Sequence, residues 1–246
     1  MSIPDAVQGL ERELRRVFGS RLQSLSMYGL RARPAHDAHD SHGGHGHAAP
    51  PTRTLAVIES LTADDLRACA TSVESWHEAG LATPLLVAAG EFERSLDAFP
   101  LEFGAILADH VVVSGRGPFD SATVDPADVR RACEVQARSH LIHLREGFLE
   151  TRGNGGALAV LVVRSAAAFA GLVSSVARLD GHAANDEATA ARHVERMLGV
   201  AGGQITEVTR LAGTDDISSE EAARIFPGYL DAVQRLVARV DQWSAR

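Results

Sequence analysis

Lysine is absent from this chain of 246 residues, so arginine supplies every permanent positive side-chain charge. A Schiff-base lysine, a lysine general base and the lysine of a P-loop are therefore all excluded. Only two cysteines are present, Cys69 and Cys133, and they do not form a Cys-x-x-Cys pair. This usage excludes a disulfide framework and indicates two buried thiols in a reducing cytoplasm.

Positive charge is also scarce overall, because 24 arginines face 32 acidic residues and the formal net charge is -8. Proteins that bind nucleic acid generally need a surplus of positive charge to neutralise phosphates, so we expect no general nucleic-acid binding. The first residues mix acids with arginines and contain no continuous apolar run, so we expect no signal peptide. The most apolar stretch, residues 157–177, contains Arg164 and is diluted by Ser and Ala. We interpret it as a buried helix of a cytoplasmic protein with no membrane association.

The first half of the chain alternates helix and strand signals. Apolar residues at helical spacing predict an amphipathic helix that ends near Gly19. Residues 33–52 are rich in His, Gly and Pro, which predicts a loop without a core of its own. The remaining patterns predict strands at 22–28, 55–61, 84–88 and 110–113, one helix at 62–80, and a short helical turn at 91–96.

The second half shows helix signals only. Asp125 and Pro126 have the residue types of a helix N-cap and first position, and they begin a long helix that ends at the glycine-rich turn 153–156. Further helices are predicted at 157–177, at 186–198, from Ser218 to a stop at Pro227, and at 230–243. The sequence therefore predicts an α+β protein, in which a small mixed sheet with flanking helices (residues 1–120) precedes an all-α helical bundle (residues 124–246).

A glycine turn follows the first predicted strand in residues 24–34, SLSMYGLRARP. This segment resembles the first signature of the polymerase-beta type nucleotidyltransferase superfamily, where an apolar strand leads into Gly-Ser-x-Ala-Arg-Gly. With its helical second half, the chain is most similar to bacterial relatives of kanamycin nucleotidyltransferase. The resemblance implies that residues 1–120 form a nucleotidyltransferase-like α/β domain.

The resemblance also implies where the site would lie and what it lacks. In the family, the Gly-Ser turn meets the nucleotide phosphates, and an Asp-x-Asp pair on the next strand holds two magnesium ions. Here Gly29 keeps its place, but Leu30 stands at the serine position, and Thr52 and Thr54 stand at the aspartate positions. A neutral hydroxyl supplies no charge to a hard divalent cation, so we expect metal-dependent nucleotidyl transfer to be lost.

A cleft without metal can still bind an anion. Arg31, Arg33 and Arg53 cluster at its start if the fold is correct, and guanidinium groups bind phosphates and carboxylates well. The predicted nucleotide-binding positions are Gly29, Leu30, Arg31, Arg33, Thr52 and Thr54. We therefore expect a catalytically degenerate protein, a pseudoenzyme, that binds a nucleotide, a small anion or a partner protein.

Two alternatives remain open. Asp37 and Asp40 lie in the loop between the two strands, and an active nucleotidyltransferase could use them as non-standard carboxylates for magnesium. The same loop could instead make this a metal-binding protein, because imidazole is a good ligand for zinc or nickel. The predicted metal ligands are five histidines of this His-rich loop, His36, His39, His42, His45 and His47. The competing interpretation is a solvated loop whose histidines only titrate.

Outside this loop, His140 and His143 lie three residues apart on the long helix. A metal site would need a second element to complete it. Because His140 borders the apolar stripe of the helix, we expect a histidine at the edge of the core that makes one hydrogen bond.

Overall fold

The computed structural model describes residues 2–30, 50–116, 119, 122–182, 186–200 and 202–243. These residues divide into two compact units, and the boundary falls between Val124 and Asp125 in the sequence. The first unit holds a sheet with helices, and the second is helical, so the α+β prediction is confirmed. The two units are described separately below.

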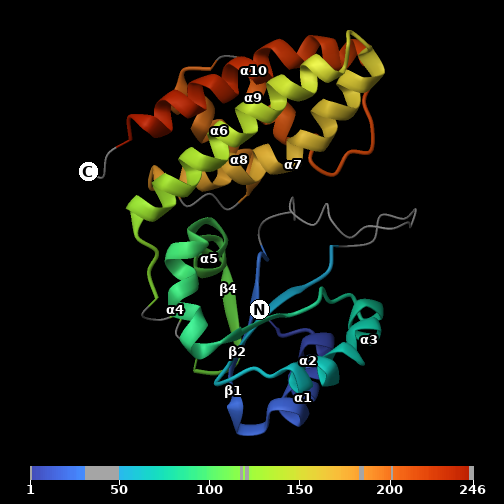
Figure 1. The fold of residues 1–246 in the computed structure, drawn as a ribbon, viewed down its shortest axis with the longest axis vertical. Coiled ribbons are helices and arrows are strands. Elements are labelled where there is room, and N and C mark those ends of the chain that lie inside the picture. Colours follow the sequence, from blue (N-terminus) through green and yellow to red (C-terminus); the bar gives the residue numbers. More distant parts are fainter. Residues whose placement is uncertain are drawn as a thin grey trace. The chain divides into compact units, whose positions relative to one another are not determined.

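The first unit is built around a four-stranded mixed sheet of order β3-β2-β1-β4 (Figure 1). The central strand β1 is antiparallel to both neighbours, whereas β2 and β3 run parallel. Its elements are α1 (Asp5–Phe18), a 3-10 turn (Gly19–Arg21), β1 (Leu22–Tyr28), β2 (Arg53–Ile58), α2 (Ala63–Ala70), α3 (Val73–Glu78), β3 (Leu85–Ala88), α4 (Ala89–Ala98), α5 (Pro100–Ala108) and β4 (His110–Gly115).

Each face of this sheet has its own apolar core. Successive side chains of a strand point to opposite faces, so β1 and β2 each contribute to both cores. One core joins Met27 and Ala56 to α1, α2 and α3, with Trp76 from α3 buried against them. The other joins Leu55 and Val57 to α4 and α5 through Phe92 and neighbouring residues. The sheet is therefore covered by helices on both sides.

Three predictions for this unit need correction. The helix predicted at 62–80 is two helices, because the chain turns at Thr71 and Ser72, where the Ser72 amide bonds the Cys69 carbonyl at 3.0 Å. The predicted turn at 91–96 is the full helix α4, and α5 was not predicted. The apolar run of α5 has little helical periodicity, and its helix is favoured by Pro100 at the first position. The second predicted strand begins and ends earlier than expected, at Arg53 and Ile58.

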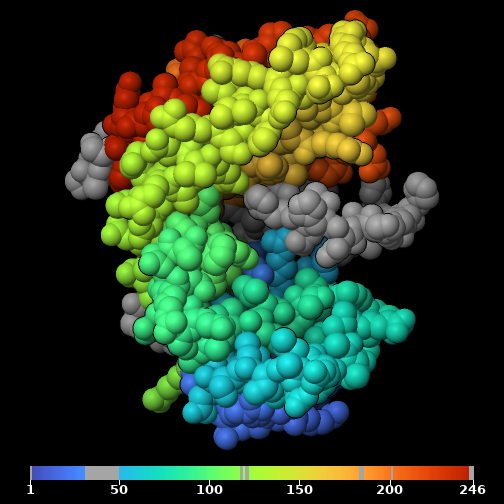
Figure 2. All heavy atoms as spheres, viewed as in Figure 1, coloured from blue at the N-terminus to red at the C-terminus, as the bar shows by residue number. Residues whose placement is uncertain are grey.

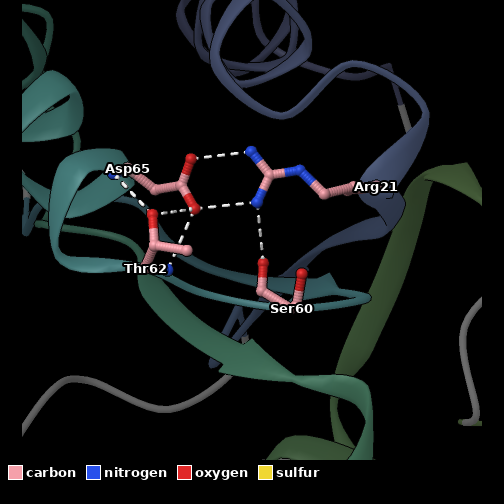
Figure 3. A network of polar contacts seen from close by, with 4 residues as sticks. All are labelled: Arg21, Ser60, Thr62 and Asp65. Atoms are coloured by element: carbon pink, nitrogen blue, oxygen red, sulfur yellow. Dashed lines mark hydrogen bonds and ion pairs between the residues drawn. The ribbon is translucent and has the colours of Figure 1, made fainter.

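A polar network joins the start of β1 to the start of α2 (Figure 3). Arg21 donates to both carboxylate oxygens of Asp65 at 2.7 and 2.8 Å and to the Ser60 carbonyl at 3.1 Å. Asp65 also accepts from Thr62, whose own hydroxyl accepts the Asp65 amide and completes a capping box. The hydrogen bonds from Arg21 and Thr62 hold the pKa of Asp65 well below its usual range. The network therefore fixes the loop that follows β2.

The second unit is a bundle in which three long helices, α6, α7 and α10, pack against one another (Figure 1). The N-cap Asp125 accepts a hydrogen bond from the Ala127 amide at 2.8 Å, as the sequence predicts for the start of the long helix. The unit contains α6 (Pro126–Glu150), α7 (Gly155–Leu179), α8 (Glu187–Leu198), α9 (Gln204–Thr209) and α10 (Ser219–Asp241).

The prediction that Pro227 ends a helix is wrong, because α10 continues through it. Proline in a helix interior removes one backbone hydrogen bond at a cost of about 3 kcal/mol. Burial of Phe226, Tyr229 and Leu236 along the same helix offsets that cost, and Phe226 also stacks on Phe148 of α6 with ring centroids 4.6 Å apart. The short helix α9 was not predicted.

The apolar stretch at 157–177 lies within α7, which packs against α6, α8, α9 and α10. Within the described residues, α7 is the one helix long and apolar enough to cross a membrane, judged by length and composition alone. In its most apolar window 44% of the residues are buried inside the bundle, including Phe169, Leu172 and Val173. The helix thus serves as the centre of the bundle core, as predicted.

Candidate functional site

The glycine turn ends strand β1 as the sequence predicts. Gly29 has φ of +67°, a value that side chains other than glycine rarely adopt, and its amide donates to the Asp109 carbonyl at 3.0 Å. Among the described residues, and apart from its two chain neighbours, no heavy atom lies within 4 Å of the position that a Cβ would occupy at Gly29. Leu30 packs against the apolar core on the α1 side. At the position of the family's serine, this chain therefore has an apolar contact.

The two threonines at the expected metal positions differ in exposure. Thr54 lies opposite Met27 in the β1–β2 ladder and is 1% exposed. Its hydroxyl has no hydrogen-bond partner among the described residues. Thr52, two residues earlier, is only partly buried, and its backbone amide and carbonyl bond Gly80 and Ala82, both at 2.9 Å. Only Thr52 is therefore near solvent, and neither residue brings a charge.

A second row of side chains crosses the same end of the sheet on the opposite face. Arg53, Tyr28 and His110 are directly paired across β2, β1 and β4, so their side chains share the α4–α5 face. The His110 ring stacks on Phe119 with centroids 4.8 Å apart. Its Nδ1 lies 3.1 Å from the Leu107 carbonyl, which can only accept, so Nδ1 carries the proton.

This row was only partly visible in the sequence. Arg53 was predicted at the site, but Tyr28 and His110 were missed because they are more than 80 residues apart and meet only through the β1–β4 pairing. The described residues contain no group of three or more His, Cys, Asp or Glu side chains arranged to hold a metal ion. In that part of the chain, the end of the sheet has hydroxyl, aromatic and cationic groups, together with one acidic residue, Asp109, whose backbone carbonyl accepts the Gly29 amide.

Several predicted site residues lie outside the described part of the chain. They are Arg31, Arg33, the carboxylates Asp37 and Asp40, and the five loop histidines His36, His39, His42, His45 and His47. The predicted anion cluster, the alternative magnesium ligands and the zinc or nickel loop therefore stay predictions. Among the positions predicted to bind a nucleotide, the structure describes Gly29, Leu30, Thr52 and Thr54, and all four lie at one end of the β1–β2 pair.

The histidine pair on α6 is not a metal site in the described structure. His140 Nε2 lies 2.6 Å from the Tyr229 hydroxyl, while His143 faces Glu146 at 3.1 Å and is exposed. Burial among Phe169 and Tyr229 lowers the pKa of His140 to about 4. This confirms the prediction of a histidine at the edge of the core with one hydrogen bond.

Comparison with known proteins gives one line of support, at the level of structure. No protein-family model and no curated protein sequence matches the chain. Among solved structures, the chain is similar to spectinomycin adenyltransferase AAD(9) from Enterococcus faecialis, whose crystal structure was determined with ATP and spectinomycin. The TM-score is 0.55 at 10% sequence identity, over 94% of this chain and 98% of the other. The likeness supports a nucleotidyltransferase-like fold.

Proposed function

We propose that this protein is a nucleotidyltransferase-like cytoplasmic protein that binds a nucleotide or small anion without metal and has lost metal-dependent nucleotidyl transfer. The site is the end of the β1–β2 pair, with the Gly29 turn on one side and Thr52 on the other. The observation that carries the proposal is the state of Thr54, which is 1% exposed and neutral where the resembled family has an aspartate.

The charge balance at this position supports the loss of transfer. A magnesium ion is normally held by carboxylates and substrate phosphates in near-ideal octahedral geometry. Thr54 is enclosed by the core beside Met27, so a cation could reach its hydroxyl only by entering an apolar environment. Without a pair of carboxylates, the two metal ions that neutralise a triphosphate have no anchor on this strand.

Retained binding is supported by the turn and by the fold. Gly29 keeps a positive φ, and no described residue beyond its chain neighbours lies within 4 Å of its Cβ position, which favours close approach of a ligand to the backbone. Arg53 adds a permanent positive charge beside the turn, and guanidinium groups bind phosphates and carboxylates through paired hydrogen bonds. The similar adenyltransferase structure contains ATP, which makes an adenine nucleotide the first ligand to test.

The decisive experiment is calorimetric titration with ATP in the presence of magnesium and again with a chelator. We expect the same dissociation constant in both conditions, because Thr52 and Thr54 supply no carboxylate at the two positions where the resembled family holds its metal ions. In parallel, labelled ATP and spectinomycin, the compound found in the similar structure, should yield no labelled product. Binding that requires magnesium, or label on the acceptor, would refute the loss of transfer.

A matched pair of glycine variants locates the site. Gly29→Ala and Gly19→Ala both place a methyl group at a positive φ, and among the described residues beyond the chain neighbours no atom lies within 4 Å of the added carbon. Both substitutions therefore strain the backbone, and the stability of each variant is measured alongside binding. We expect only Gly29→Ala to weaken ATP binding, by about tenfold, because its methyl group enters the space of the ligand. Equal effects of the two variants would place the nucleotide elsewhere.

A further inference from the structure

A groove in the helical unit joins the end of α8 to the turn before α9. Its volume is about 410 Å³, which suits a small molecule. The lining side chains come from Arg192, Glu195 and Arg196 of α8, and the turn contributes Gly199, Gly202 and Gly203. Residues three and four apart share one face of a helix, so the charged side chains of α8 point toward the same groove.

Glu195 is the unusual member of this groove, because it is a carboxylate that is only 9% exposed. Its Oε1 accepts the Thr206 amide at 2.8 Å. In the part of the chain that the structure describes, this carboxylate forms no ion pair with Arg192 or Arg196, which line the same groove. Buried carboxylates are normally paired with a cation or fully hydrogen-bonded, so this one has unused capacity to bind a cationic group.

The two arginines stand at the rim and are exposed. Arg192 donates to the Thr189 hydroxyl at 2.9 Å, and its charge also acts on Asp186. Arg196 forms no ion pair in the part of the chain that the structure describes. The groove thus has a negative floor and a positive rim, and its opposite wall is lined by Gly199, Val200, Gly202 and Gly203.

We propose that this groove binds a small zwitterion, with an ammonium group on Glu195 and a phosphate or carboxylate on Arg192 and Arg196. A ligand with an anion alone would leave the buried carboxylate unpaired. A ligand with an ammonium alone would leave the arginines solvated and would gain only one contact. Both charges on one molecule satisfy the floor and the rim together, which is the physical basis of selectivity for a zwitterion.

The test uses phosphoethanolamine as the zwitterion and compares it with ethanolamine and inorganic phosphate, by calorimetry on the full chain. We expect phosphoethanolamine to bind at least about tenfold more tightly than either half, because each charged hydrogen bond contributes a tenfold factor or more. Phosphate binding as tightly as phosphoethanolamine would overturn the proposal, and so would the absence of saturable binding.

Two variants assign the two ends of the ligand. Glu195→Gln keeps an oxygen for the Thr206 amide, so the fold should be retained, and it should weaken phosphoethanolamine by about tenfold while phosphate binding is unchanged. Arg196→Gln should weaken both phosphate and phosphoethanolamine. Glu220→Gln and Arg235→Gln, at exposed sites on α10, are the matched controls and should change neither. Equal losses in the variants and their controls would contradict the assignment.

Discussion

The two units of this protein treat buried polar side chains differently. At the centre of the sheet the buried polar groups are small neutral hydroxyls, Ser24, Ser26 and Thr54, and none of them has a hydrogen-bond partner among the described residues. In the helical bundle, the buried Tyr229 hydroxyl lies 2.6 Å from His140 and 3.1 Å from Ser165. The centre of the sheet thus has isolated hydroxyls, unlike the network of Arg21 and Asp65 in the same unit, whereas the core of the bundle has a connected network that includes a titratable imidazole.

This difference explains where each unit can respond to its surroundings. A lone buried hydroxyl cannot change charge near neutral pH, so the sheet is insensitive to protons at the position of the resembled catalytic pair. The imidazole of His140, whose pKa is lowered to about 4, changes charge only in acid. The bundle therefore contains a buried group whose titration should make stability fall below pH 6.5.

The outer face of helix α6 has both exposed apolar residues and arginines. Figure 2 shows α6 running across the visible face of the helical unit. Val135, Ile142 and Leu149 are 60–75% exposed on its outer side, at intervals of seven residues. Single exposed apolar residues are normal, and Arg131, Arg138 and Arg145 separate these three along the helix. This arrangement fits a solvated helix face.

The largest expected effect comes from placing a carboxylate at the buried threonine. Thr54→Asp should lower the free energy of unfolding by about 4 kcal/mol at pH 7, because the core forces the new carboxyl group to stay protonated about 3 pH units above its ordinary pKa. The cost should shrink by about 1.4 kcal/mol for each pH unit below 7, since the unfolded chain then also binds the proton. Urea denaturation between pH 5 and 7 measures this slope.

Thr52→Asp is the control for this change. Thr52 is only partly buried, so a carboxylate there remains hydrated and should cost less than about 1 kcal/mol, with no comparable pH slope. If Thr54→Asp were as stable as Thr52→Asp, the claim that the centre of the sheet excludes a charged group would be wrong. In that event the sheet could hold a charge at the family's metal position, and magnesium binding by the double variant would become the next measurement.

The second effect belongs to the bundle and has the opposite sign with pH. Burial lowers the pKa of His140 from 6.5 to about 4. Between these two pH values the imidazole is protonated in the unfolded chain and neutral in the folded chain. The free energy of unfolding should therefore fall by about 3 kcal/mol as the pH drops from 6.5 to 4, and then level off. Denaturation of the wild-type chain and of His140→Gln should differ by this pH-dependent amount.

His143→Gln is the matched control, because His143 is exposed beside Glu146 on the same helix. It should reduce the acid slope only slightly, because burial is the main cause of the lowered His140 pKa and the charge of His143 is the smaller one. The chain has other groups that titrate in this window, so the informative quantity is the difference between each variant and the wild type. A slope in His140→Gln as steep as in the wild type would remove His140 as the source of acid sensitivity.

The sequence predicts elements that depend on local patterns, and it misses features that depend on tertiary contacts. Strand β1 and helix α1 follow from alternation and helical spacing, and Asp125 and Ser218 identify helix starts, because these signals lie within a few residues. Helix α10 runs through Pro227 because burial of Phe226 and Tyr229 outweighs a local rule. The burial that offsets the cost of Pro227 can be seen only in the packed bundle and not in the sequence.

The same limit applies to the sites. The Gly29 turn is visible in the sequence because its signal is one glycine after an apolar strand. The row of Arg53, Tyr28 and His110 depends on which strands pair, which the sequence alone does not specify. Glu195 had a local signal that was overlooked, since it occupies the apolar stripe of α8 four residues after the buried Ala191.

The smallest expected effect makes the comparison between the units direct, because it removes one buried hydroxyl from each. Thr54→Val should not lower stability and should raise it by up to about 1 kcal/mol, since the hydroxyl that is lost has no partner and its burial is unfavourable. Tyr229→Phe should cost about 1–2 kcal/mol, because His140 loses its hydrogen bond inside the bundle.

Each unit carries one tryptophan, Trp76 in the first and Trp243 in the second, so fluorescence can report the two variants separately. Thr54→Val is measured in a Trp243→Phe background, where Trp76 reports on the sheet unit. Tyr229→Phe is measured in a Trp76→Phe background, where Trp243 reports on the bundle. If the two losses were equal, a connected network would stabilise no more than an isolated hydroxyl. The difference between the two cores would then make no difference to the free energy of unfolding.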